Sequence, residues 1–152
     1  MPRPGTFFRA GIGAVITDGK KRVLACERYK IRGAWQMPQG GIEEGEEPLD
    51  AAYREVEEET AITRERLELV HSCPEPLAYE LPPQYRTRRI GRGQVQYWFL
   101  FRLVGGDGVI NLGENGEFRD WQWMTMPDLI ASAVPFRVPL YRRIAECVRD
   151  HL

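Results

Sequence analysis

Residues 40–62 read GGIEEGEEPLDAAYREVEEETAI, a glycine pair followed by an acidic loop and a run rich in alanine and glutamate. The run 48–60 is dense in strong helix formers, and Pro48 falls where the first turn of a helix tolerates proline. We therefore predict a helix over 48–60. At about 100° per residue this helix carries two stripes. They are an apolar stripe of Leu49, Ala52, Tyr53 and Val56, and an acidic stripe of Glu55, Glu58 and Glu59.

The acidic stripe places glutamates at i, i+3 and i+4, where like charges repel by roughly a few tenths of a kcal/mol per pair. A divalent cation would offset this repulsion, and Mg²⁺ prefers oxygen ligands while keeping waters that phosphate oxygens can replace. Gly40 and Gly41 leave bare backbone before the helix, Glu46 adds a carboxylate at its entrance, and Arg54 can orient Glu55. The alternative is a solvated acidic helix face.

The rest of the chain alternates strand and helix signals. Strands are predicted over 7–16, 22–27, 67–73, 94–104 and 118–124, with a tight turn at Asp18-Gly19 between the first two. Further helices are predicted over 127–133 and 138–152. Strands outnumber helices, and helices fall both mid-chain and at the end. We therefore predict an α/β fold, a mixed β-sheet flanked by helices, in a single domain spanning 1–152.

Composition limits the classes of protein that remain. The net charge of −1 excludes a uniformly basic nucleic-acid binder. Cys26, Cys73 and Cys147 are odd in number and far apart, which fits neither a disulfide framework nor a paired zinc knuckle and indicates a reducing compartment. Residues 1–9 show no leader segment, and no run is long enough to span a bilayer, so we expect a cytoplasmic protein without membrane contact. No protein partner is inferred, and monomer and homodimer both stay open.

The stretch 40–62 resembles the Nudix box, usually written GX5EX7REUXEEXGU with U an aliphatic residue. The residues that match it are Gly40, Glu46, Arg54, Glu55, Val56, Glu58, Glu59 and Ile62. Ala61 stands where the pattern has its later glycine. Alanine there costs about 1 kcal/mol if the turn after the helix is left-handed, so the departure bears on the local turn and not on the glutamates.

Four further segments resemble the RNA pyrophosphohydrolase and dinucleoside polyphosphate hydrolase branch of that family, namely 35–42, 96–100, 117–123 and 141–143. The resemblance implies the Nudix α/β/α sandwich and a divalent ion, Mg²⁺ or alternatively Mn²⁺. The implied metal ligands are Gly40, Glu55, Glu58, Glu59 and Glu117. The same four glutamates and Arg54 are implied to be catalytic, with Glu55 preferred as the general base. For Glu117 the alternative is a surface glutamate beside a strand.

The resemblance also implies a set of substrate contacts, in which Phe136 would stack on a base. These contacts are Arg9, Arg28, Gln94, Phe136 and Arg137. Phe136 can equally belong to the core. Tyr79 and Tyr85 are further stacking candidates, although aromatic residues in a chain of this size are usually buried.

Proton transfer is expected from a carboxylate, because His71 and His151 fall in a predicted strand and at the C-terminus. No Ser or Cys stands in a nucleophile elbow, which favours direct attack by water. We expect removal of pyrophosphate from 5′-triphosphate RNA to leave 5′-monophosphate RNA, or cleavage of a dinucleoside polyphosphate such as diadenosine tetraphosphate. The rival class, a non-catalytic nucleotide-sensing Nudix module, is disfavoured by the intact glutamate set.

Overall fold

The structure is a computed structural model that describes residues 7–114 and 116–152. Residues 1–6, which include most of the segment in which the sequence analysis expects no leader, lie outside the described residues. The strands are β1 (Phe8–Thr17), β2 (Val23–Arg28), β3 (Trp35–Gln36), β4 (Gln39–Gly41), β5 (Leu67–Ser72), β6 (Leu77–Glu80), β7 (Gly93–Leu103) and β8 (Phe118–Met124). The α-helices are α1 (Pro48–Thr60), α2 (Met126–Ser132) and α3 (Val138–Val148).

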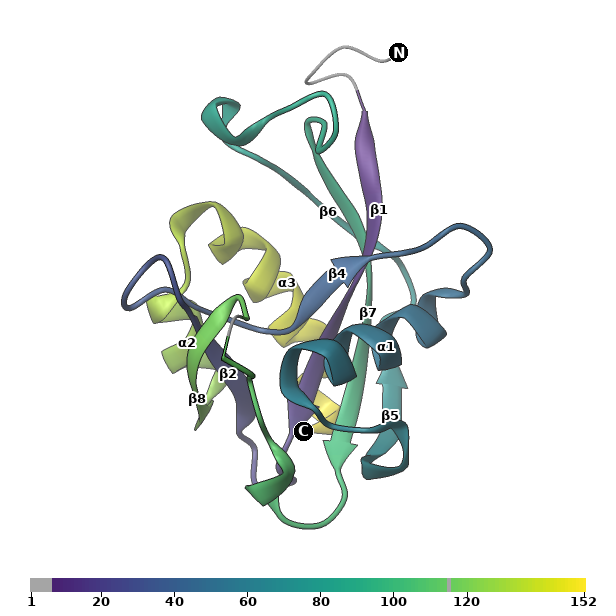
Figure 1. Ribbon diagram of the computed structural model, residues 1–152, viewed down its shortest axis with the longest axis vertical. Helices are drawn as coiled ribbons and strands as arrows, with labels where there is room; N and C mark the ends of the chain where they lie inside the picture. The colour runs from purple at the N-terminus through teal and green to yellow at the C-terminus, as the bar shows by residue number, and fades with distance from the viewer. Residues whose placement is uncertain (1–6, 115) are drawn as a thin grey trace.

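All of these strands belong to one sheet whose main path runs β3-β2-β1-β7-β5 (Figure 1). β4 pairs with β1, β6 with β7, and β8 with β2. The two long central strands, β1 and β7, are parallel over ten residue pairs, whereas every other described strand pair is antiparallel. The sheet is therefore mixed, as predicted. Along one edge of β1, β2 pairs near Thr17 and β4 pairs near Gly11. The edge of β1 is therefore shared between two strands, and β2 and β4 diverge from it.

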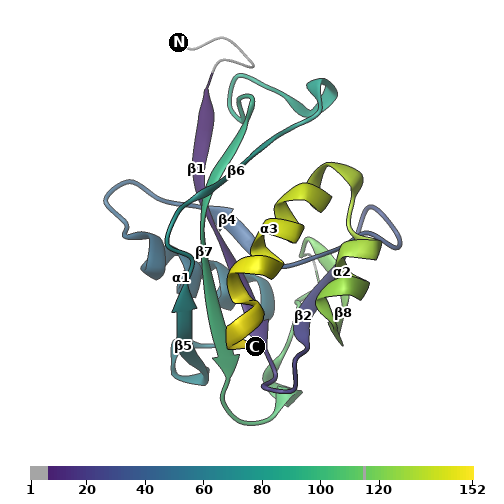
Figure 2. The ribbon, with the colours of Figure 1, turned by 180° about the vertical axis from the view of Figure 1, so that it is seen from behind.

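The central strands are buried on both faces, and their side chains alternate between two hydrophobic clusters. Ile12, Ala14 and Ile16 pack with Ala52 and Val56 of α1. The opposite face of the sheet packs against α3. Its side chains Val15, Ala25, Trp98 and Leu100 belong to one cluster with the α3 side chains Leu140, Tyr141, Ile144 and Val148. Figures 1 and 2 show α1 on one face and α2 and α3 on the other. This is an α/β/α sandwich, and the period of two along each strand accounts for its two layers of core.

The long elements agree with the sequence prediction. The helix over 48–60 and the strand over 118–124 are confirmed at both ends, and the others shift by a few residues. The last helix ends at Val148, and residues 149–151 continue as a 3₁₀ turn rather than as α-helix. The short strands β3, β4 and β6 were not predicted, because two to four residues carry no readable periodicity. Within the described residues, no helix has the length and apolar character needed to cross a membrane.

The turn after α1 is left-handed although it carries alanine. Ala61 has φ 65° and ψ 8°, and its N–H donates to the Glu57 carbonyl at 2.9 Å. The preceding Thr60 is fully buried, and its carbonyl accepts a hydrogen bond from the Asn111 N–H at 2.8 Å. These contacts hold the strained conformation, so the exchange of glycine for alanine leaves the helix end where the Nudix pattern puts it.

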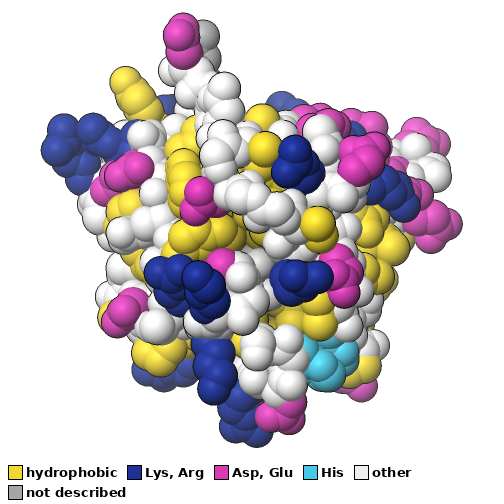
Figure 3. All heavy atoms as spheres, turned by 90° about the horizontal axis from the view of Figure 1, so that it is seen from below, with side chains coloured by type: hydrophobic (Ala, Val, Ile, Leu, Met, Phe, Trp, Pro, Cys, Tyr) yellow, Lys and Arg dark blue, Asp and Glu magenta, His cyan; other side chains and the backbone are white. Residues whose placement is uncertain are grey.

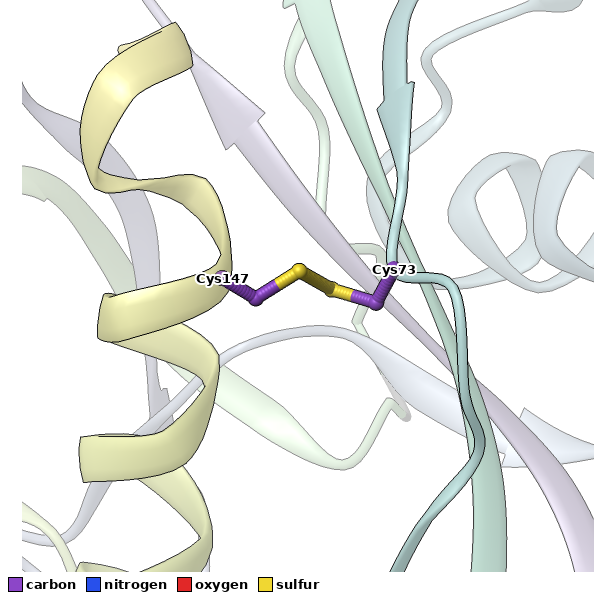
Figure 4. Close-up of a disulfide and its surroundings, with 2 residues drawn as sticks. All are labelled: Cys73 and Cys147. Carbon is purple, nitrogen blue, oxygen red and sulfur yellow. A yellow bond between two sulfur atoms is a disulfide. The ribbon is translucent and has the colours of Figure 1, made fainter.

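The expectation that the cysteines do not pair is wrong for two of them. Cys73, just beyond the end of β5, forms a disulfide with Cys147 of α3, with their Cα atoms 6.1 Å apart (Figure 4). The two residues are 74 positions apart in sequence, and only the packing of α3 on the sheet brings them together. Cys26 is free and buried in β2. The odd number of cysteines and their wide spacing in sequence therefore do not predict whether this pair forms a disulfide.

Candidate active site

Arg54 is the hub of the acidic helix face. Its Nε and one terminal nitrogen donate to the two carboxylate oxygens of Glu46 at 2.8 and 2.9 Å. The other terminal nitrogen donates to Glu55 at 2.9 Å and lies 3.4 Å from Glu58. Arg54 also donates to the Gly41 carbonyl at 2.9 Å. The pair with Glu46 raises the pKa of Arg54 and lowers that of Glu46 to about 2, so both stay charged and fix the loop 41–46 to the helix.

Glu59 is the most buried member of the acidic stripe. Burial, followed by the charges of Glu117 and Glu55, raises the pKa of Glu59 to about 9, although the Gln39 N–H donates to it. Its Oε2 has no hydrogen-bond partner in the described part of the chain. Burial also raises the pKa of Glu55, with Glu58 and Glu117 adding to the effect and Arg54 opposing it. Glu117, which precedes β8, therefore lies close enough for its charge to raise the pKa of Glu55 and of Glu59, whereas Glu58 is more exposed.

The glycine pair allows β4 to pass directly under the cluster. A Cβ on Gly40 would lie 2.1 Å from the carboxylate carbon of Glu55, so any side chain there would displace it. A Cβ on Gly41 would lie 2.6 Å from a terminal nitrogen of Arg9, which extends from β1 to the same glycines. The glycine pair therefore leaves room for the Glu55 carboxylate and the Arg9 guanidinium, and the approach of its bare backbone to a metal or a phosphate stays a prediction.

These groups suit a divalent cation by their chemistry. Glu59 has an unpaired buried carboxylate oxygen, and the charges of three further carboxylates raise its pKa, so the site lacks positive charge. Within residues 7–114 and 116–152, no three His, Cys, Asp or Glu side chains are already arranged around one point as metal ligands. Arg54 accounts for part of this, because it draws Glu55 and Glu58 toward itself. An all-oxygen donor set of this kind fits Mg²⁺ or Mn²⁺.

A cleft leads away from the carboxylates. Its first part, of about 350 Å³, is lined by Glu117 and by basic and amide side chains. Its second part, of about 700 Å³, is lined by Tyr79, Tyr85 and Phe136. Arg28, Gln39 and Arg137 line both parts, so the two adjoin. Four of the five predicted substrate residues lie in this cleft, namely Arg28, Gln94, Phe136 and Arg137. Arg9 lies at the glycine pair instead.

Arg137 is an unusually buried cation, with 6% of its surface exposed. One terminal nitrogen donates to Gln36 at 2.6 Å, whereas its Nε is buried with no hydrogen-bond partner in the described residues. Its guanidinium lies 5.3 Å from the ring centre of Phe136. Phe136 in turn lies 6.1 Å from Tyr79 at 23° between the ring planes. The cleft thus contains a cation, Arg137, beside the aromatic side chains of Phe136 and Tyr79. Phe136 both packs against the core and lines the cleft.

Two residues of this cleft were not singled out from the sequence. Gln36 holds Arg137 by its side chain, and Gln39 donates its N–H to Glu59 while lining both parts of the cleft. Both sit on the short strands β3 and β4, which sequence patterns did not reveal. Their position immediately before the glycine pair was the available signal.

The α/β/α sandwich, with glutamates from one helix meeting a basic and aromatic cleft, is the arrangement of a hydrolase that handles phosphorylated compounds. The chain belongs to the Nudix family, because the NUDIX domain model matches residues 7–144. The chain is a Nudix hydrolase, as its curated relatives agree.

Those relatives cover nearly the whole chain. It is 41% identical over 155 residues to an RNA pyrophosphohydrolase of Cereibacter sphaeroides, covering 98% of this chain and 96% of the relative. It is 41% identical to the RNA pyrophosphohydrolase of Rhodospirillum rubrum, covering 92% and 86%. Among solved structures it is similar to a C. elegans Ap4A hydrolase in a binary complex, with a TM-score of 0.70 and 27% identity over 93% of this chain and 98% of that one.

Proposed function

We propose that this Nudix hydrolase removes pyrophosphate from the 5′-triphosphate end of RNA and leaves 5′-monophosphate RNA. The observation that carries the proposal is the continuity of the cleft, in which Arg28 and Arg137 lie between the carboxylates and an aromatic pocket. A terminal nucleotide with a phosphate chain needs three kinds of contact in this order. The aromatic side chains would bind the base, the arginines would bind the phosphates, and the carboxylates would lie at the phosphorus that reacts. The relatives named RNA pyrophosphohydrolase support the same substrate.

The proposed cation is Mg²⁺, with Mn²⁺ as a substitute. Glu55, Glu58, Glu59, Glu117 and the Gly40 main chain would hold it, and the ion would screen the charge of the phosphates. The unpaired Oε2 of Glu59 supports this assignment. Arg54 keeps Glu46 and Glu55 in place, so its part is to position the carboxylates.

Glu55 is the proposed general base. Glu55 is half-buried, and this burial raises its pKa above the ordinary value of a glutamate. A base works best when its pKa approaches the working pH. Glu55 would take a proton from the attacking water, and Arg54 would hold its carboxylate in one orientation. Attack in line with the leaving pyrophosphate then depends on alignment and charge screening.

The lining of the cleft supports the proposed substrate contacts. Arg28 and Arg137 would bind phosphate oxygens, and the buried, unpartnered Nε of Arg137 supports an anionic ligand there. Phe136 would stack on a base, with Tyr79 and Tyr85 beside it. Gln94 lines the same pocket, and Arg9 would reach the phosphates from the glycine pair.

A second candidate is cleavage of a dinucleoside polyphosphate. The similarity to the C. elegans Ap4A hydrolase favours it, and the larger part of the cleft, about 700 Å³ with three aromatic side chains, suits a purine base. Both reactions would use the same carboxylates. We further propose a cytoplasmic enzyme that acts in messenger RNA decay, with no protein partner needed for the site.

The deciding experiment compares two substrates on one enzyme preparation. A short 5′-triphosphate RNA and diadenosine tetraphosphate are incubated with Mg²⁺, and products are resolved by chromatography. We expect pyrophosphate and 5′-monophosphate RNA at a higher kcat/KM than for diadenosine tetraphosphate, and no turnover with chelator in place of Mg²⁺. Turnover of diadenosine tetraphosphate alone would select the second candidate, and Mg²⁺-independent turnover would reject both.

A further inference from the structure

Both histidines of the chain and two of its three cysteines lie together between β5 and α3. Cys73 is bonded to Cys147, and the rings of His71 and His151 are stacked with centroids 3.9 Å apart and planes 14° apart. Figure 3 shows the two imidazoles as one cyan patch on the surface. We call these four residues the His/Cys tetrad. It takes no part in the active site described above.

The tetrad is built from two regular backbone segments. His71 and Cys73 are two positions apart at the end of β5, so their side chains leave the strand on the same side. The Cys73 N–H donates to the Trp98 carbonyl at 3.0 Å, which keeps this segment on the sheet. Cys147 and His151 are four positions apart at the end of α3 and its 3₁₀ extension, about one helical turn. Each segment thus presents one sulfur and one imidazole to the other.

Two thiolates and two imidazoles are the donor set of a Cys₂His₂ zinc centre. We propose that His71, Cys73, Cys147 and His151 bind one Zn²⁺ when the Cys73–Cys147 disulfide is reduced. With the disulfide closed, both sulfurs are used, and the described residues contain no ready group of three or more metal-binding side chains. A disulfide by itself needs neither imidazole, whereas the zinc centre uses all four side chains.

The dimensions suit this exchange. Tetrahedral Zn²⁺ with Zn–S bonds of about 2.3 Å requires sulfurs about 3.8 Å apart. A disulfide holds them about 2.0 Å apart, so the sulfurs must separate by roughly 2 Å. The Cα atoms, 6.1 Å apart, allow this by side-chain rotation alone. Cys73, Cys147 and His71 are half-buried and His151 is exposed, so a reductant and a metal ion can reach them.

The step balances in electrons, protons and charge. A dithiol reductant supplies two electrons and two protons, the S–S bond breaks, and the dithiol closes to its own disulfide. Zn²⁺ then displaces both thiol protons to form two Zn–S bonds, and the imidazoles bind as neutral ligands. In the reverse direction a small-molecule disulfide such as oxidised glutathione accepts the two electrons and two protons and becomes two thiols, while the Cys73–Cys147 bond forms again and the ion is released. Either state fastens α3, which follows directly on Phe136 and Arg137, to the edge of the sheet.

Cobalt provides a direct readout of the proposed ligand set. The full chain is reduced with a water-soluble phosphine, which becomes the phosphine oxide and leaves no competing thiol. It is then titrated with Co²⁺ alone. We expect thiolate-to-cobalt charge transfer and the intense visible bands of tetrahedral cobalt, saturating at one ion per chain and bleached by Zn²⁺. Oxygen ligands of the active site give neither signal. Unreduced protein should show none of it, and equal signals from reduced and unreduced protein would overturn the proposal.

Three variants separate the tetrad from other thiols. The double variant His71→Ala/His151→Ala should bind Zn²⁺ more than about 100-fold more weakly, because even an outer-shell partner is worth 10- to 100-fold. Cys73→Ser should abolish the charge-transfer bands. Cys26→Ala, which removes the buried free thiol, should leave them unchanged. Bands that survive in both His71→Ala/His151→Ala and Cys73→Ser, with undiminished affinity, would show that the tetrad is not the site.

Thermal unfolding adds a second readout. Reduction should lower Tm by removing the crosslink, and Zn²⁺ should restore part of the loss in the reduced chain by binding the folded state. The same Zn²⁺ should not restore Tm in reduced His71→Ala/His151→Ala. Equal recovery in both proteins would contradict zinc binding at the tetrad.

Discussion

The two faces of the sheet contribute to the active site in different ways. On the α1 face, three glutamates, their arginine and the glycine pair come from residues 40–59, and helix geometry gathers the glutamates and the arginine. On the α3 face, the aromatic pocket takes side chains from β6, from the loop before β7 and from the 3₁₀ turn Pro135–Arg137. The charge-bearing half of the site is thus local in sequence, and the substrate-binding half depends on topology. Changes on the α1 face should reduce kcat, and changes on the α3 face should raise KM.

The largest effect should come from the buried carboxylates. Glu55→Gln and Glu59→Gln each keep side-chain shape but replace one carboxylate oxygen by an amide group that neither accepts the proton of water nor binds the ion. We expect kcat to fall by about 10³-fold in Glu55→Gln, within the range for loss of a general base, and by a similar factor in Glu59→Gln. Glu57→Gln is the matched control, since it makes the same substitution at an exposed position of the same helix. Steady-state kinetics on 5′-triphosphate RNA measure all three. Equal losses in Glu57→Gln would mean that helix charge in general, rather than the cluster, governs the rate.

Gly40→Ala should reduce kcat by about 100-fold, because a methyl group there displaces the Glu55 carboxylate and misplacement by about 1 Å has costs of this size. Gly108→Ala is the control, since its Cβ meets open space and its backbone is not left-handed. Circular dichroism checks that both variants fold. Wild-type kcat in Gly40→Ala would show that the position of Glu55 does not limit turnover.

On the α3 face, Phe136→Ala should raise KM about 10- to 100-fold while changing kcat little, because stacking on one base contributes about 1–3 kcal/mol. Phe136→Tyr, which keeps the ring, should stay within a few fold of wild type. The same kinetic assay separates KM from kcat. A fall in kcat with unchanged KM would assign Phe136 to the core rather than to substrate binding.

Acidity offers a test of Glu59 without substrate. Its pKa is about 9 in the fold and about 4.3 in an unfolded chain, so the folded state binds the proton more tightly. The resulting stability is fully present below about pH 4 and is lost as the pH rises toward 9. We therefore expect Tm of the metal-free protein to fall over this range, and Mg²⁺ to raise Tm more at high pH.

The control for this pH dependence is Glu59→Gln, in which both trends should weaken. Calorimetry resolves the change, because about 1 kcal/mol shifts Tm by roughly 2–4 °C in a chain of this size. Identical pH profiles in wild type and Glu59→Gln would show that another group is responsible.

The smallest effect should come from Ala61→Gly at the end of α1. Glycine relieves a left-handed conformation that costs alanine about 1–2 kcal/mol and loses about 0.5–1 kcal/mol in chain entropy, a net gain of about 0.5–1 kcal/mol. Denaturant unfolding measures the gain, and activity should not change. A loss of stability would mean that contacts of the alanine methyl outweigh the backbone strain.

The sequence revealed the glutamates of α1 because residues at i, i+3 and i+4 always share one side of a helix, and Glu55, Glu58 and Glu59 have this spacing. Glu117 was added to this set only by family resemblance, and in the structure its charge raises the pKa of Glu55 and of Glu59. The long strands were readable for the same reason, since period two over many residues leaves a pattern. The metal-binding and catalytic roles of these residues stay predictions.

The α3 half was less accessible from sequence. Tyr79 reaches Phe136 only because β6 pairs with β7, and β6 is too short to leave a pattern. Gln36 and Gln39 act from strands of two and three residues. The pairing of Cys73 with Cys147 needs α3 to lie over the sheet, which no count of cysteines can reveal. Contacts between distant segments are properties of the fold, and single-sequence patterns record only local ones.

The most direct test of the account is anomalous diffraction from crystals grown with Mn²⁺ and a nonhydrolysable triphosphate analogue. We expect Mn²⁺ bound to the carboxylates of Glu55, Glu59 and Glu117, and phosphate oxygens bridging from the ion toward Arg137. Crystals that contain the bound analogue but no Mn²⁺ at these glutamates would contradict the central claim that this cluster is the metal site of the enzyme.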